Sequence, residues 1–258
     1  MSYEFITTER RGNILLVRLN RPEVYNAVHP PMHHELAEVW DGFATNPDLW
    51  VAVLTGAGDK AFTAGNDLKF TAAGGKGTMP ASGFAGLSQR FDLEKPIIAA
   101  VNGFAMGGGF ETALSCDIIL SADTATFALP EVKVGFFAAA GGIQRLSRYI
   151  GRLAAQELVL TGRSMMAAEA LSMGVVNAVV PKADLMTVAM AKAEEITNVS
   201  PSAVKASKRV LNEMAVAEGL PDSLLYSREV VADLAQTEDF KEGVQAFVEK
   251  RKASWVNR

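Results

Sequence analysis

Short apolar runs alternate with stretches of helical periodicity through the first two-thirds of the chain, and this order constrains the fold more than any other feature. The runs are apolar at nearly every position, which is typical of parallel strands buried on both faces. Helical spacing is clearest at 32–43, where Leu36, Val39, Trp40 and Phe43 share one face. We therefore expect an α/β fold whose helices cover the sheet, with strands at 14–19, 50–54, 97–101, 118–121 and 175–180.

The last third of the chain has a different character. From residue 183 onward helical periodicity continues almost without strand signals, and Ser200-Pro201 is a typical N-cap and first-turn pair. We expect an α/β core at 1–190 and a helical segment at 191–258. The polar, Gly-rich stretch at 71–82 fits a surface loop. Helices are predicted at 153–160, at 185–196, from 200 to 214, at 220–236 and at 240–251.

Composition and charge narrow the function classes. Of the 258 residues, 49% are hydrophobic and 21% are charged, as in a globular protein with a sizeable core. The net charge is −4 and Lys and Arg gather in no block, which disfavours a nucleic-acid partner. The single cysteine, Cys116, can form neither an intramolecular disulfide nor a zinc cage. With no signal-peptide pattern and no apolar run of about 18 residues, we expect a soluble, cytoplasmic protein without a membrane segment.

Several common chemistries lack their motifs. The sequence contains no G-x-G-x-x-G, no P-loop and no G-x-S-x-G nucleophile motif. Three histidines, His29, His33 and His34, cluster beside Pro30-Pro31 without the H-E-x-x-H spacing of a metal site. We interpret them as polar residues at a solvated helix entrance and expect no metal.

Two glycine-containing segments are candidates for binding an anionic oxygen. In the segment 61–69, Gly65 allows a sharp turn between a strand and a helix. In the segment 101–111, the consecutive glycines 107–109 precede an apolar helix, so backbone N–H groups at the helix start are open to a ligand. Together the segments could form an oxyanion hole. The alternative for each is that glycine only permits tight turns and close packing.

Two glutamates in apolar surroundings are candidates for proton transfer. Glu111 lies in the first turn after the glycines, and Glu131 follows Pro130. Burial would raise the pKa of each carboxyl group towards neutral pH, as a proton-transferring acid requires. The alternative is that each only complements the helix dipole. Asp67, beside Asn66, is interpreted as a turn or cap residue.

These residues resemble the enoyl-CoA hydratase/isomerase (crotonase) family, over nearly the whole chain. No single motif is specific, but their order and spacing together are. The matching motifs are Leu19-Asn20-Arg21-Pro22 with Asn26-Ala27, Val53–Gly56, Ala64–Lys69, Lys95-Pro96 with Ala99–Gly103, Gly107–Glu111, Ala128–Glu131, Gly141-Gly142 with Gln144–Leu146, Leu160–Arg163, and Phe247 with Glu249–Arg251.

The resemblance implies a crotonase-like spiral of ββα turns and a helical C-terminal trimerisation segment, in a homotrimer or hexamer. It also implies an acyl-CoA thioester substrate, with coenzyme A as part of the substrate and no separate cofactor. By position, the backbone N–H groups of Asn66 and Gly108 would form the oxyanion hole, and Glu111 and Glu131 would be the two catalytic glutamates. Retention of both glutamates favours hydration over isomerisation. Residues expected along the CoA or the substrate are Ala64, Asp67, Leu68, Lys69, Phe247 and Lys250.

Two departures from the family pattern bear on the substrate. The residues Phe136–Ala140 stand where the family often has a Pro-Gly or Pro-Asp pair, which should make the wall of the acyl pocket more apolar. Asn66 stands where alanine or a bulky residue is more usual. Within the family, the segments 83–87, 91–96, 109–111 and 127–131 look most like the crotonobetainyl-CoA hydratase branch. Two alternatives stay open: a double-bond isomerase of the same fold, and a noncatalytic RNA-binding member, which the acidic balance disfavours.

Overall fold

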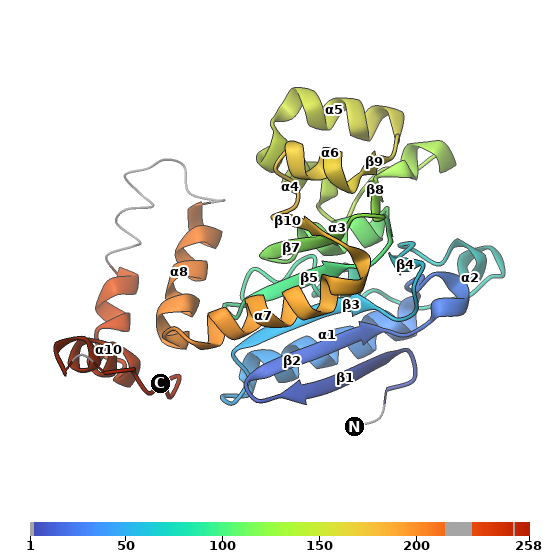
Figure 1. The fold of residues 1–258 in the computed structure, drawn as a ribbon. Coiled ribbons are helices and arrows are strands. Elements are labelled where there is room, and N and C mark those ends of the chain that lie inside the picture. The colour runs from blue at the N-terminus through green and yellow to red at the C-terminus, as the bar shows by residue number, and fades with distance from the viewer. Residues whose placement is uncertain (1–2, 215–228, 250) are drawn as a thin grey trace.

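A computed structural model describes residues 3–214, 229–249 and 251–258, and its α/β body is built on two sheets (Figure 1). The first has the strand order β1-β2-β3-β5-β7-β10, in which β1 and β2 are antiparallel and the following neighbours are parallel. Its strands are β1 (Ile6–Arg11), β2 (Ile14–Leu19), β3 (Val51–Gly56), β5 (Ile97–Val101), β7 (Ile118–Ala122) and β10 (Ala178–Val180).

The second sheet is smaller and carries the loops that matter for function. Its order is β4-β6-β8-β9, with β4, β6 and β8 parallel to one another and β9 antiparallel to β8. Its strands are β4 (Ala61–Thr63), β6 (Phe104–Met106), β8 (Thr126–Ala128) and β9 (Met165–Met166).

A repeated ββα unit links the two sheets. The units are β3-β4-α2, β5-β6-α3 and β7-β8-η3, each with one strand in the first sheet, one in the second and then a helical turn. This arrangement confirms the expected spiral. Because β4, β6 and β8 are parallel neighbours, their carboxyl ends meet at one edge, so the loops after them converge. The helical elements are α2 (Leu68–Ala72), α3 (Gly108–Leu114) and the 3-10 helix η3 (Pro130–Val134).

Burial explains why the central strands read as continuous apolar runs. Every residue of β3 and β5 is buried, and helix α7 (Leu185–Thr197) packs on β3, β5 and β7. Helix α1 (Pro30–Thr45) buries Leu36, Trp40 and Phe43. The Trp40 indole also donates a 3.0 Å hydrogen bond to the carbonyl of Ala85, which ties α1 to the 3-10 turn η2 (Phe84–Gly86). The remaining elements of the body are η1 (Pro22–Val24), α4 (Gly142–Ile150), α5 (Arg152–Thr161), α6 (Ala167–Ser172) and η4 (Lys182–Asp184).

The C-terminal helices extend away from the α/β body (Figure 1). Helix α8 (Pro201–Met214) is attached to it by Lys208, whose Nζ donates to the carbonyl of Lys95 at 2.9 Å and to Asp117 Oδ2 at 2.8 Å. Helix α10 (Glu238–Glu249) joins α8 through Asp239, which accepts a 2.8 Å bond from the Ser202 hydroxyl. Across the described ranges, none of the helices has the length and apolarity that crossing a membrane would need.

The strand boundaries expected from the sequence agree best with the observed ones where a strand is long and buried. The strands at 14–19 and 97–101 are present with those limits, whereas the run at 175–180 pairs only over Ala178–Val180. Strand β1 was not expected because only Ile6 of it is buried, and the short strands of the second sheet have too few residues for a periodicity. The helix predicted at 220–236 lies largely outside the described residues. The domain boundary predicted at residue 190 falls within α7 and stays a prediction.

Candidate active site

The loops after β4 and β6 lie against each other where the parallel strands end. Gly65 follows β4 with a φ of +85°, a conformation that side chains disfavour. A side chain there would place its Cβ 2.9 Å from the backbone nitrogen of Gly108 and still closer to the carbonyl of Met106. Only glycine permits this approach, which brings Asn66 next to the start of α3.

Two backbone N–H groups at this contact are available to a ligand. Asn66 forms an isolated parallel bridge with Val28, in which Gly65 and Asp67 make the hydrogen bonds and the N–H of Asn66 points to the other side. Gly108 is the first residue of α3, where an N–H has no partner inside the helix. Within the part of the chain that the structure describes, neither N–H has a hydrogen-bond acceptor.

At each glycine of the run 107–109, a neighbouring residue occupies the space that a side chain would need. Gly107 has a φ of +54°, and a Cβ on it would lie 2.8 Å from Glu131 Oε1. A Cβ on Gly108 would collide with the ring of Phe84, and one on Gly109 would collide with the carbonyl of Thr63. Glycine is therefore required here by packing as well as by backbone conformation.

Glu111 is a buried carboxyl group held by the start of helix α4. Its Oε1 accepts hydrogen bonds of 2.8 Å from the N–H groups of both Ala140 and Gly142, and the residue is only 3% exposed. The pKa of Glu111 is raised to about 7, and burial is the largest cause. The charge of Glu131 contributes to this rise, whereas the two N–H groups and Arg145 oppose it.

Glu131 lies at the carboxyl end of β8, in η3, and is half-buried. Burial raises its pKa as well. Its Oε2 is buried and has no hydrogen-bond partner among the described residues, which is unusual for a carboxylate oxygen. Glu111 thus belongs to the first turn of α3, the carboxylate of Glu131 lies against Gly107 at the start of this turn, and the free N–H of Gly108 is in the same turn.

This arrangement can do acid–base chemistry next to a stabilised oxyanion. The model of the family described as enoyl-CoA hydratase/isomerase matches residues 9–258. The chain belongs to this enoyl-CoA hydratase/isomerase family. A relative from Escherichia coli O157:H7 named carnitinyl-CoA dehydratase is 44% identical over 264 residues, which cover 99% of each chain.

Solved structures of the family have the same fold. The enoyl-CoA hydratase from Mycobacterium tuberculosis H37Rv superposes with a TM-score of 0.93 at 36% identity, covering 98% of this chain and 99% of that one. The carnitinyl-CoA hydratase from Mycobacterium avium gives a TM-score of 0.79 at 41% identity and covers both chains completely.

Among the residues predicted to lie along the CoA of this family member's substrate, some are exposed and one is buried. Ala64, Leu68 and Lys69 are exposed around the start of α2. Asp67 is buried, and both of its oxygens are used within the chain: Oδ1 accepts from the N–H of Phe70 at 2.9 Å, and Oδ2 pairs with Arg21 at 2.8 Å. The carboxylate therefore caps α2, as the cap interpretation of its sequence position predicts. Of the residues predicted at the nucleotide end, Lys250 and the side chain of Phe247 lie outside the described residues.

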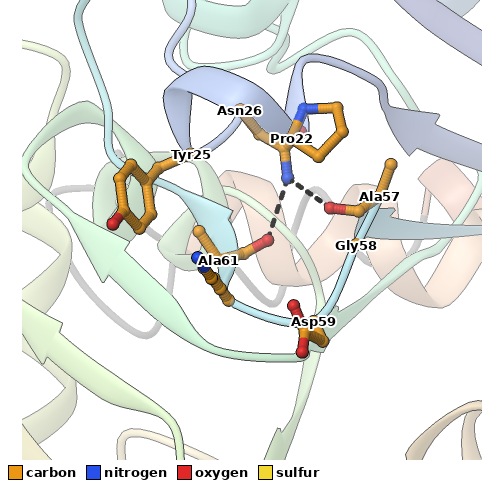
Figure 2. A pocket seen from close by; sticks show the side chains of 8 residues that line it. Pro22, Tyr25, Asn26, Ala57, Gly58, Asp59 and Ala61 are labelled. Atoms are coloured by element: carbon orange, nitrogen blue, oxygen red, sulfur yellow. Dashed lines mark hydrogen bonds between the residues drawn. The ribbon is translucent and has the colours of Figure 1, made fainter.

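Asn26 is a site-supporting residue whose function the sequence did not reveal. Figure 2 shows its amide nitrogen directed at the carbonyl oxygens of Ala57 and Ala61, both at 2.9 Å. Its Oδ1 accepts a 2.9 Å bond from the N–H of Arg21. The amide borders a cavity of about 100 Å³ and fixes the turn that leads into β4, and thus into the Gly65 loop. The only indication of its importance in the sequence was that Asn26 belongs to one of the motifs that resemble the family.

The interpretation of the histidines as solvated was wrong for His29 and His33. His33 is 2% exposed, its Nδ1 accepts from the N–H of Ala85 at 2.9 Å, and its ring meets Phe84 edge-on at 4.5 Å. His29 is 5% exposed and packs between aromatic rings. The reason is that η2 and α2 cover the start of α1. Only His34 is exposed, and the described part of the chain contains no cluster of three or more His, Cys, Asp or Glu that could hold a metal.

An aromatic pair lies on the segment that is predicted to line the acyl pocket. Phe136 and Phe137 are 61% and 57% exposed and stack on each other, with their centroids 5.3 Å apart. Their loop joins the two glutamate sites, because Phe136 donates its N–H to the carbonyl of Glu131 and Ala140 donates to Glu111.

Proposed function

We propose that this chain adds water across the α,β double bond of an enoyl-CoA thioester and removes it in the reverse direction. The main support is that two carboxyl groups of raised pKa, Glu111 and Glu131, belong to or lie against the turn that starts α3, where two N–H groups lack an acceptor in the described chain. Family membership supports the CoA thioester as substrate.

The oxyanion hole is assigned to the N–H groups of Asn66 and Gly108. When water attacks Cβ, the electron pair of the carbon–carbon double bond moves to Cα and onto the thioester oxygen. Two fixed donors in a site poor in water stabilise the charge that develops there. Removal of one such donor typically lowers the rate by about 10²–10³-fold. This stabilisation is larger in the transition state than in the substrate, so it raises the rate and does not only tighten binding.

The proton transfers are assigned to the two glutamates. Glu111 holds the attacking water and takes one of its protons, while the hydroxide part bonds to Cβ. Glu131 helps to hold the same water and gives a proton to Cα, so that the product gains one hydrogen and one hydroxyl group. In dehydration each group performs the opposite transfer. The unpaired Oε2 of Glu131 supports this role, because a ligand or a proton would satisfy it.

We further propose that the acyl group carries a quaternary ammonium, as in carnitinyl-CoA. Support comes from relatives named carnitinyl-CoA dehydratase and from the solved carnitinyl-CoA hydratase of Mycobacterium avium. The exposed rings of Phe136 and Phe137 are compatible with such a group, because the face of an aromatic ring attracts a quaternary ammonium. An apolar wall is therefore no obstacle to this cation.

The test is a panel of enoyl-CoA thioesters that includes crotonobetainyl-CoA and its neutral analogue with a tert-butyl group in place of the trimethylammonium. Loss of the conjugated thioester absorbance, with a product heavier by one water, is expected for the enoyl-CoA class. Preference for crotonobetainyl-CoA over the neutral analogue supports the finer proposal, whereas equal rates contradict it. A shift of the double bond without gain of water would indicate an isomerase, and no turnover of any member contradicts the enzyme proposal.

Three accompanying properties are proposed from the family resemblance. Turnover requires no separate cofactor, which full activity after dialysis against a chelator would support. The protein is a homotrimer or a hexamer, which light scattering of the purified chain decides. It acts in the cytoplasm, which fractionation of the source cells would check.

A further inference from the structure

Arg145, in the first turn of α4, contacts the loop that holds Glu111. Its Nη1 donates to the carbonyl of Ala140 at 3.3 Å, and the N–H groups of Ala140 and Gly142 in turn hold Glu111 Oε1. The guanidinium lies directly over Gly141, where a Cβ would collide with Nη1. Gly141 has a φ of +92°, so the loop both requires glycine and is covered by this side chain.

The other end of the guanidinium reaches the support of the second donor. Arg145 Nη2 donates to the carbonyl of Ser88 at 2.8 Å. The hydroxyl of Ser88 accepts a 2.9 Å bond from the N–H of Phe84, and the ring of Phe84 packs directly on Gly108. One planar side chain therefore bridges the Glu111 loop and the turn that covers Gly108.

The positive charge of Arg145 acts on both Tyr149 and Glu111. Among the described residues, no carboxylate lies within 4.0 Å of the guanidinium. The guanidinium instead donates to two carbonyls and lies over the ring of Phe91, 5.7 Å from its centroid. The ionisable groups that influence the pKa of Arg145 are, from the largest effect to the smallest, Tyr149, Glu111, Cys116 and Arg148. Those that influence Glu111 are Glu131 and Arg145, with opposite signs.

We propose that Arg145 is a positioning residue for the hydration reaction, which orients Glu111, places a positive charge near it and aligns it with the Gly108 donor. This rests on the proposed function. Arginine suits the task because its planar fork donates in two directions while its charge is permanent. Lysine would keep the charge but would lose the fork.

The experiment compares Arg145→Met and Arg145→Lys with the wild type. For Arg145→Met we expect kcat to fall at least about tenfold with KM little changed, because small misplacements of catalytic groups cost rate. The acidic limb of the pH profile should move upward, because a positive charge near Glu111 is lost. Arg145→Lys should restore the position of the limb but recover only part of kcat. An unchanged limb in Arg145→Met, or full recovery of kcat by lysine, would overturn the proposal.

A readout independent of turnover separates this proposal from the proposed function. The carboxyl carbon of Glu111, labelled with ¹³C and assigned by its loss in Glu111→Gln, can be titrated by NMR in each variant. An upward shift of its pKa in Arg145→Met but not in Arg145→Lys supports the positioning role even if the substrate panel fails. The charge-matched control is Arg152→Met at the exposed first residue of α5, which should change neither the titration nor kcat. A shift of equal size in that control would show a general charge effect and refute the assignment.

Discussion

The carboxylate of Glu131 occupies the space that a side chain on Gly107 would need. The two residues are far apart in the sequence, yet a Cβ on Gly107 would lie 2.8 Å from Glu131 Oε1. The turn that starts α3 and the acid at the end of β8 are therefore packed against each other, so a change in either should displace the other.

Replacement of Gly107 by alanine tests this contact. We expect a loss of stability of about 1–3 kcal/mol from the positive φ, and a further loss of activity because Glu131 is displaced. Gly174→Ala is the matched control, since Gly174 also has a positive φ, +77°, but open space around it. Thermal unfolding and kcat are measured for both. If Gly174→Ala lost as much activity, backbone strain rather than the Glu131 contact would be responsible.

Replacement of either glutamate should abolish most hydration. Glu111→Gln and Glu131→Gln each remove one proton-transferring group while keeping the side chain's size, and a positioned acid or base typically contributes about 10²–10⁴-fold. Steady-state rates on an enoyl-CoA are compared with those of Glu157→Gln, a change at an exposed carboxylate that pairs with Arg163. Retention of most activity by Glu111→Gln would favour an isomerase that needs a single acid.

The pH dependence of hydration should reflect the ionisation of Glu111. Burial raises the pKa of this carboxyl group from 4.5 to about 7, and the group must be ionised to take a proton from water. We therefore expect kcat/KM for hydration to fall as the pH drops through about 7. The profile is measured with a substrate that does not titrate in this range, and a limb near 4.5 would contradict the assignment.

The same pKa shift has a consequence for stability. Because the folded state binds the Glu111 proton more tightly than the unfolded state, folding stability falls as the pH rises from 4.5 to about 7 and stays lower above it. Glu111→Gln removes this cost, so it should be more stable than the wild type above pH 7, by up to about 3 kcal/mol. Denaturant unfolding at pH 5 and pH 8 gives the comparison. An advantage of the variant that is equal at both values would point to packing.

The side chain of Asn66 should be dispensable. Only its backbone N–H is assigned to the oxyanion hole, and that N–H is oriented by the bridge between Val28 and the residues that flank Asn66. We expect Asn66→Ala to keep kcat within about threefold of the wild type, whereas loss of a true donor would cost about 10²–10³-fold. A loss of that larger size would indicate that the side-chain amide of Asn66, and not its backbone N–H, is the oxyanion-hole donor.

The sequence predicted the long elements and several candidate residues, and the reasons are physical. Strands such as β5 are buried along their whole length, so their pattern is unambiguous. Glu111 and the glycines were found because an acid and three small residues in an apolar setting are uncommon. The burial of His33 was not predicted, because it depends on η2, where Ala85 takes a φ of +53° that no residue pattern announces. The partners of Arg145 are two backbone carbonyls, which have no sequence signature.

The side-chain amide of Asn26 connects Arg21, at the start of η1, to the turn before β4, and it binds both segments (Figure 2). Aspartate would fit the space but would lack the amide donors that bind the two carbonyls. Chimaeras between this chain and its relatives should therefore inherit residues 20–27 and 56–61 from one parent. A crossover between these blocks would leave the loop of Gly65 to be supported by two surfaces that were never selected to fit each other.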